Sequence, residues 1–186
     1  MRRLFCLLTV IVPALFAGDP LATSAQQKLD LISALKVKPG ASVELSPQEI
    51  NGWVRERRPK SIPQGLRNER IDLGAGTADG TGLIDLLKLG EAKGREINRF
   101  IGMLIEGERP LKISIRVESS NGRCTVFLTR VELSGIPVEG SILDFLIKNF
   151  FAPRYPDAKI NQPFDLDFNI DRIDVRPSGV RITMKK

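Results

Sequence analysis

The sequence predicts an α+β domain in which a strongly curved antiparallel sheet packs against a hydrophobic helix. Apolar and polar residues alternate along six segments, which pair into three hairpins. Helical spacing of apolar residues occurs before, between and within these hairpins. Two of the six segments also change phase midway, as a strand does at a β-bulge, and bulges bend a sheet.

The first 25 residues have the features of a secretory signal peptide. Arg2 and Arg3 supply positive charge, residues 4–17 are apolar, and small residues end the segment at Ala25. The apolar stretch is too short for an ordinary membrane span, so an uncleaved anchor is only the alternative. We therefore predict export to the periplasm or the extracellular space, cleavage after Ala25, and a single domain over residues 26–186.

The absence of histidine limits the chemistry of this chain. With no histidine among 186 residues, Ser-His-Asp and Cys-His nucleophile systems, His-ligated zinc and a histidine proton shuttle are excluded. Cleavage after Ala25 would remove Cys6 and leave Cys124 without a disulfide partner. Cys124 lies in a strand pattern, which favours a small buried hydrophobe over a catalytic thiolate. We expect no catalytic residue, no metal and no cofactor.

Two helices are predicted before the first hairpin. Residues 26–38 carry apolar side chains at helical spacing. The second helix has stronger signals, with Ser46 at the N-cap, Pro47 in the first turn, and Glu49 completing a capping box. Pro59 ends this helix.

Each of the three predicted hairpins has a turn that contains glycine. The strands comprise residues 71–75 and 83–89, turned at 78–80; residues 111–118 and 123–134, turned at 121–122; and residues 164–176 and 179–185, turned at 177–179. The phase changes lie within residues 123–134 and 164–176. A bulge explains each change, and strands that are apolar on both faces would explain them equally.

The segment Ser141–Phe151 is predicted to be an unusually apolar helix. Its apolar side chains cover an arc of about 180°, so the simplest interpretation is burial against the sheet. Each fully buried phenylalanine contributes about 1.5–3 kcal/mol, so phenylalanines left exposed would favour contact with lipid or another apolar ligand. The residues expected to form this apolar wall are Ile142, Phe145, Leu146, Phe150 and Phe151.

Basic residues concentrate between positions 55 and 70. Such a surface would attract anionic lipid head groups and permit peripheral contact with an anionic membrane, although a solvated basic rim is the simpler interpretation. Nucleic acid is disfavoured by the predicted export and by the absence of aromatic residues among these cations. We expect head-group contacts from Arg55, Arg58 and Arg154.

Two further motifs have simpler structural interpretations. Asp165, Asp167 and Asp171 alternate along a strand, so a solvent-facing row is favoured over a calcium site or an acid/base pair. The glycine-rich segment 74–82 lacks the spacing of a phosphate-binding loop and is interpreted as a hairpin.

The order of these features resembles a known family. Residues 45–51 (LSPQEIN), 131–137 (VELSGIP) and 173–182 (IDVRPSGVRI) follow the pattern of small exported bacterial proteins of the tubular lipid-binding (TULIP-like) group, such as the periplasmic lipoglycan-elongation accessory family. The resemblance implies a curved antiparallel sheet around a long helix, with an apolar groove for phospholipid. The segment Ser141–Phe151 is shorter than the helix of that group, which bears on the size of any groove.

The sequence thus predicts a non-enzymatic protein of the cell envelope that binds phospholipid or another apolar ligand between sheet and helix. The first alternative is an interaction module in envelope assembly that holds no ligand. The second is a hydrolase, which would require two of Asp165, Asp167, Asp171 and Asp174 to converge in a cleft.

Overall fold

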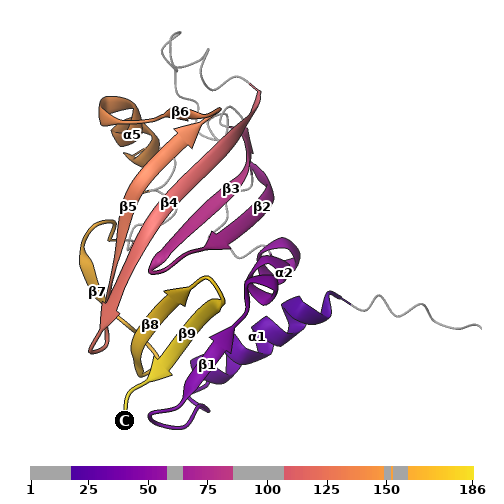
Figure 1. Ribbon diagram of the computed structural model, residues 1–186, viewed down its shortest axis with the longest axis vertical. Coiled ribbons are helices and arrows are strands. Elements are labelled where there is room, and N and C mark those ends of the chain that lie inside the picture. Colours follow the sequence, from indigo (N-terminus) through magenta and orange to yellow (C-terminus); the bar gives the residue numbers. More distant parts are fainter. Residues whose placement is uncertain (1–17, 58–64, 86–106, 149–151, 153–158) are drawn as a thin grey trace, which may run out of the picture.

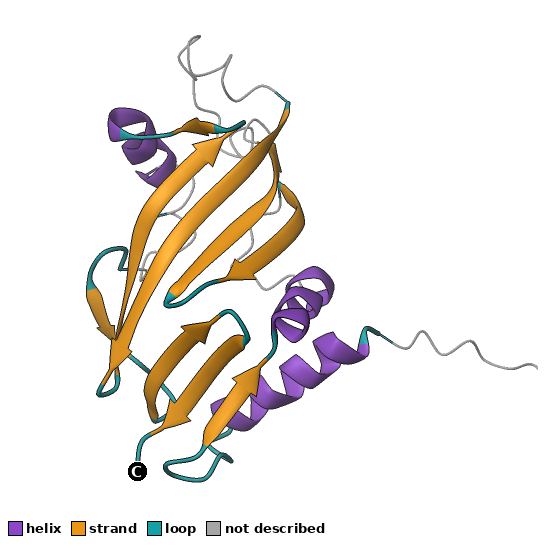
Figure 2. Ribbon diagram, in the orientation of Figure 1, coloured by secondary structure: helices purple, strands orange, loops and turns teal. Residues whose placement is uncertain are grey.

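The computed structural model describes residues 18–57, 65–85, 107–148, 152 and 159–186 (Figures 1 and 2). The apolar part of the predicted signal peptide lies outside the described residues, and so do Arg58, Phe150, Phe151 and Arg154. The side chains of Ile142, Phe145 and Leu146 are likewise outside the described part, although the helix that carries them is described.

The described strands form two antiparallel sheets beside the helices (Figure 1). In chain order the elements are α1 (Pro20–Ser33), β1 (Ser42–Leu45), α2 (Pro47–Arg57), β2 (Leu66–Leu73), β3 (Thr77–Asp85), β4 (Glu108–Ser120), β5 (Arg123–Leu133), β6 (Ile136–Pro137), α5 (Gly140–Leu146), β7 (Pro163–Asp165), β8 (Ile170–Arg176) and β9 (Gly179–Met184). The larger sheet has the order β2-β3-β4-β5-β6, with β7 paired to β5, and the smaller has the order β1-β9-β8. The predicted α+β class is confirmed.

The prediction of one strongly curved sheet is wrong, because the strands divide between two sheets and the larger is not strongly curled. The predicted strand 164–176 is two strands, β7 in the larger sheet and β8 in the smaller. Phe168 and Asn169 join them with left-handed backbone angles, φ 56° and 58°. The change of phase itself lies in β8, where Ile170 pairs with Met184 and Arg172 pairs with Thr183. Asp171 therefore has no opposite residue, and a β-bulge accounts for the change of phase, as predicted.

The phase change in β5 is a β-bulge, as predicted. Ser114 pairs with Arg130 and Ile115 pairs with Leu128, so Thr129 has no opposite residue. The Thr129 hydroxyl donates to the Ser114 carbonyl oxygen at 2.9 Å. The extra residue returns the apolar side chains of β5 to one side of the sheet.

Residues with positive φ angles form the turns of the first two hairpins. Asn121 and Gly122 form the predicted β4–β5 turn with φ 51° and 73°. The predicted turn at 78–80 is wrong, because Asp79 and Gly80 pair within β3 against Ser114 and Ile113 of β4. The chain turns instead at 74–76, where Gly76 has φ 69°.

Both N-terminal helices begin with side-chain caps. The capping box of α2 is confirmed, since the Ser46 N–H donates to Glu49 Oε2 at 2.8 Å and the Glu49 N–H donates to Ser46 Oγ at 3.2 Å. In α1 the Leu21 N–H donates to Asp19 Oδ1 at 2.9 Å, so the helix begins at Pro20 rather than at Gln26. The predicted cleavage site after Ala25 therefore lies inside α1.

We expect a chain that begins at Gln26 to be less stable than one that begins at Gly18. Ala22 and Ala25 are 0% and 1% exposed, and burial of two methyl groups together with a helix cap contributes about 2–3 kcal/mol. Urea unfolding followed by circular dichroism measures the difference. Equal midpoints for the two chains would show that residues 18–25 do not support the fold.

Two hydrophobic clusters form the described core. The first cluster contains Ile84, Val131, Leu133 and Val138, with Leu143 of α5 packed against it. The second lies between the smaller sheet and the N-terminal helices and contains Ala25, Ile32, Leu45, Ile170, Ile182 and Met184. Cys124 is buried as predicted, and burial raises the pKa of its thiol. Among the described helices, none combines the length and the apolar character that a membrane span requires.

Candidate functional site

The larger sheet has one apolar side. In antiparallel pairs, residues that lie directly opposite each other share a face, and the register of β3, β4 and β5 joins their apolar positions. We call this side the apolar face. Its residues include Ala78, Gly80, Gly82, Ile84, Leu111, Ile113, Ile115, Val117, Val126, Leu128, Val131 and Leu133.

The opposite side of the same sheet carries paired charges. Its ion pairs are Arg67–Glu108, Lys112–Asp79, Arg116–Glu118 and Arg130–Glu132. The Arg116 guanidinium also lies over the Phe127 ring, 4.1 Å from its centre. This side therefore suits contact with water, and any apolar ligand of the sheet belongs on the other side.

Described elements cover the apolar face at its two ends. At one end α5 places Leu143 against the first cluster (Figure 1). At the other end the smaller sheet approaches the β2–β3 turn, where the Gly76 N–H donates to the Val175 carbonyl oxygen at 2.9 Å. The Ile173 N–H also donates to Ser119 Oγ at 3.0 Å.

Between these ends, the apolar face is incompletely covered by the described residues. Ile113, Ile115 and Val117 of β4 belong to neither hydrophobic cluster and are all partly exposed. A Cβ atom built on Gly80 would meet, among described atoms, only the Ile113 carbonyl oxygen, at 3.9 Å. The described part of the fold thus leaves an apolar strip along the middle of β3 and β4.

The predicted apolar wall is tested only at its start. The helix predicted over Ser141–Phe151 is described as α5, and Leu143 is the side chain that the structure places against the apolar face. The five predicted wall residues have side chains outside the described part. Their role therefore stays a prediction, although the helix begins beside the face that they were expected to complete.

The basic segment is less positive than its composition suggests. Arg55 is exposed and lies 3.7 Å from Asp19, and Arg70 lies 2.9 Å from Asp72. A cavity of about 370 Å³ lies beside α2 and β2 here, lined in part by Arg55, Arg70 and Asn51. The Asn51 side chain exchanges two 2.8 Å hydrogen bonds with the Ile71 backbone, which closes this edge of the sheet. Head-group contact by Arg55 stays a prediction.

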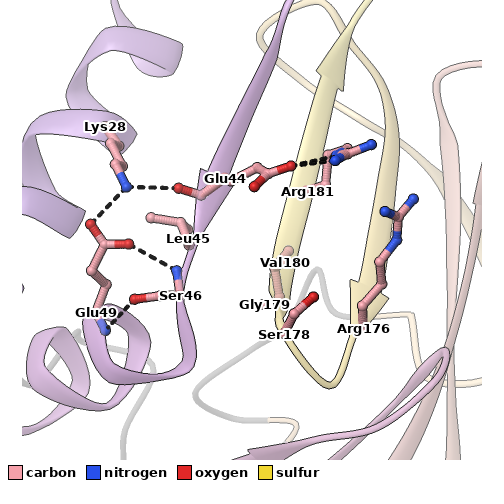
Figure 3. A pocket seen from close by; sticks show the side chains of 10 residues that line it. All are labelled: Lys28, Glu44, Leu45, Ser46, Glu49, Arg176, Ser178, Gly179, Val180 and Arg181. Carbon is pink, nitrogen blue, oxygen red and sulfur yellow. Dashed lines mark hydrogen bonds and ion pairs between the residues drawn. The ribbon is translucent and has the colours of Figure 1, made fainter.

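A second cavity, of about 270 Å³, lies between α1, β1 and the β8–β9 turn (Figure 3). Lys28 Nζ lies 2.7 Å from Glu49 Oε1 and donates to the Glu44 carbonyl oxygen at 2.8 Å. The Glu44 carboxylate in turn accepts from Arg181 Nε at 2.7 Å. These contacts join α1, β1, α2 and β9, so the charges around the cavity hold the small sheet to the helices.

The network lowers the pKa of Glu49 and so favours its carboxylate form. Burial alone would raise its pKa, but hydrogen bonds from Lys28, from the Ser24 hydroxyl at 2.6 Å and from the Ser46 N–H lower the pKa to about 2. A general acid or base works best with a pKa near the operating pH. The carboxylate is therefore suited to structural support rather than to proton transfer.

The aspartates of the hydrolase alternative do not form one row. Asp165 lies on β7, is exposed, and is 3.7 Å from Arg123. Asp174 lies on β8 and is 3.2 Å from Arg172. Among the described residues, no group of three or more histidine, cysteine or acidic side chains is placed to hold a metal ion.

No family model matches this chain, and neither a curated protein nor a solved structure matches it. A fold by itself does not assign a function. The function is therefore inferred from the chemistry and geometry of the described residues.

Sequence reasoning missed two parts of these sites. The small residues Ala78, Gly80 and Gly82 of β3 were assigned to a turn and its flank, although their alternation with Asp79 and Thr81 was a usable strand signal. The contact of Lys28 with Glu49 had no sequence signal, because the two residues belong to different helices.

Proposed function

We propose that this protein is a non-enzymatic binding protein for a lipid acyl chain or another apolar ligand, which lies along the apolar face. The observation that carries the proposal is the partly exposed strip of Ile113, Ile115 and Val117 between the two hydrophobic clusters. A ligand on this strip would remove apolar surface from water, which is the main favourable contribution to such binding.

The size of the strip suits one acyl chain. From Leu111 to Val117 the strand extends about 20 Å. The small residues Ala78 and Gly80 would let a ligand approach the neighbouring strand β3, since a Cβ atom on Gly80 would meet, among described atoms, only the Ile113 carbonyl oxygen, at 3.9 Å. Burial of about ten methylene groups contributes about 8 kcal/mol, equivalent to a Kd of about 1 µM before the entropy of association is subtracted. Useful affinity therefore requires no covalent chemistry.

Two sequence features favour the same class of ligand. The predicted signal peptide would deliver the protein to the cell envelope, where lipids are abundant, and the resemblance to tubular lipid-binding proteins implies a phospholipid groove. The predicted wall residues would extend the binding surface from the side of α5. Arg58 and Arg154 remain predicted head-group contacts.

The test combines detection of bound lipid with a variant that fills the strip. Protein purified from the envelope fraction of cells that express the full chain is expected to carry lipid in native mass spectrometry and to take up a fluorescent fatty acid. Gly80→Leu places a side chain on the strip, and we expect it to weaken uptake by about tenfold or more. Thr81→Leu is the matched control, because it adds the same side chain to the opposite side of β3.

Two results would contradict the proposal. The first is a folded protein with neither bound lipid nor uptake, which would favour the interaction module. The second is an equal loss of uptake in Gly80→Leu and Thr81→Leu, which would show that the strip is not the binding surface.

A further inference from the structure

Arg109 is a charged residue on the apolar face. It pairs directly with Ile84 across β3 and β4, so both side chains project to the same side of the sheet. Ile84 is 6% exposed and belongs to the first cluster, and the next residue of β4 on this face is Leu111. The guanidinium therefore lies at the end of the apolar row of β4, beside the first cluster.

The Arg109 side chain lacks a partner in the described part of the chain. Its Nε atom is buried without a hydrogen bond, and no ion pair joins the side chain to another described residue. The arginines of the opposite side differ, because each has an acidic neighbour; these pairs are Arg67–Glu108, Arg70–Asp72, Arg116–Glu118, Arg123–Asp165 and Arg130–Glu132.

An unpaired guanidinium beside apolar side chains is unfavourable. Removing a cationic nitrogen from water without a hydrogen-bond acceptor costs free energy, and the cost falls when an anion supplies that acceptor. The planar guanidinium group binds carboxylate and phosphate oxygens in a bidentate manner. A ligand with an anionic oxygen group at one end would therefore satisfy Arg109.

We propose that Arg109 binds the anionic head group of an amphiphilic ligand, either a carboxylate or a phosphate, while the acyl chain of that ligand extends along β4 toward Val117. This inference rests on the proposed function, and it adds the charge and the orientation of the ligand. The β4 side chains along this path, Leu111, Ile113, Ile115 and Val117, are all partly exposed. The path is therefore apolar from the first cluster to the smaller sheet.

Ligands that differ only in their head groups test the proposal. Hexadecanoate, hexadecyl phosphate and 1-hexadecanol are compared by their ability to displace a neutral fluorescent probe, N-phenyl-1-naphthylamine, from the full chain. We expect at least one of the two anions to bind about tenfold or more tightly than the alcohol, because hydrogen bonds to a charged group have that magnitude. Preference for one anion distinguishes a fatty acid from a phosphorylated lipid.

Variants assign the preference to a residue. Arg109→Gln is expected to abolish the preference for the anion over 1-hexadecanol. Arg116→Gln is the matched control, since it makes the same change on the opposite side of the same strand, and the preference should persist. Arg109→Leu tests whether the guanidinium instead supports the fold. If Arg109 serves the ligand, the ligand-free variant should unfold at a urea concentration no lower than that of the unchanged protein.

The outcomes separate this inference from the proposed function. If the probe and all three ligands fail to bind, the proposed function is wrong. If 1-hexadecanol binds as tightly as both anions, or if Arg109→Gln keeps the preference, the assignment of Arg109 is wrong. The apolar face would then remain the proposed binding surface. A strongly destabilised Arg109→Leu would also overturn the assignment, because it would show that the guanidinium supports the fold.

Discussion

Glu49→Gln is expected to lower the free energy of unfolding by about 3 kcal/mol at pH 7. The carboxylate side chain is 8% exposed and accepts hydrogen bonds from Lys28, Ser24 and Ser46. Removing its charge leaves the Lys28 ammonium without its ion pair and weakens the capping box of α2. Urea unfolding measured by Trp53 fluorescence reports this loss, since Trp53 lies on α2 and donates to Gln26 of α1 at 2.8 Å.

The same carboxylate makes the stability depend on pH. Its pKa is lowered from 4.5 to about 2 in the folded protein, so its contribution is present above pH 4.5 and is lost as the pH falls through about 2. Glu49→Gln should flatten the stability profile over this interval. Glu44→Gln is the matched control, because Glu44 is 64% exposed and its pair with Arg181 contributes at most about 1 kcal/mol. Similar midpoints for the two variants would contradict the buried network.

Gly179→Ala is expected to lower the free energy of unfolding by about 3 kcal/mol or more. A Cβ atom on Gly179 would lie 2.4 Å from the Leu45 carbonyl oxygen, and the contact is with backbone that cannot rotate away. The φ of 145° is also a conformation that residues with a side chain rarely adopt. The added methyl group must therefore displace either the β8–β9 turn or the end of β1, and thermal or urea unfolding measures the loss.

Gly135→Ala separates the two causes of this loss. Gly135 also has a positive φ, 77°, but no described atom lies within 4 Å of a Cβ atom built on it. Its substitution should cost only about 1 kcal/mol, from the left-handed backbone alone. If Gly179→Ala is no more damaging than Gly135→Ala, the turn does not pack closely against Leu45.

Local sequence signals predicted the local structure well. The capping box of Ser46 and Glu49 and the turn at Asn121 and Gly122 are present as expected. The phase change in β5 correctly indicated a bulge, now placed at Thr129. Each of these features depends on hydrogen bonds or backbone angles within a few residues or one hairpin, so the information lies close together in the chain.

Signals that depend on the partner of a strand were less informative. The segment 164–176 alternates like one strand, yet Phe168 and Asn169 divide it between two sheets. The turn predicted at 78–80 lies within β3 because pairing with β4 extends to Thr77. Alternation shows that a residue faces one side or the other, and it does not show which strand lies beside it or what covers that side.

For the candidate site, the sequence by itself determined the apolar row of β4 and its alternation with charge, since a strand places every second residue on the same face. Only the tertiary structure decided that this row continues onto Gly80 and Leu128 of the neighbouring strands, that described elements cover it only at its ends, and that Arg109 lies on it without a described partner. Strand register and burial bring together residues that are distant in the chain, so these properties are not encoded in any short segment.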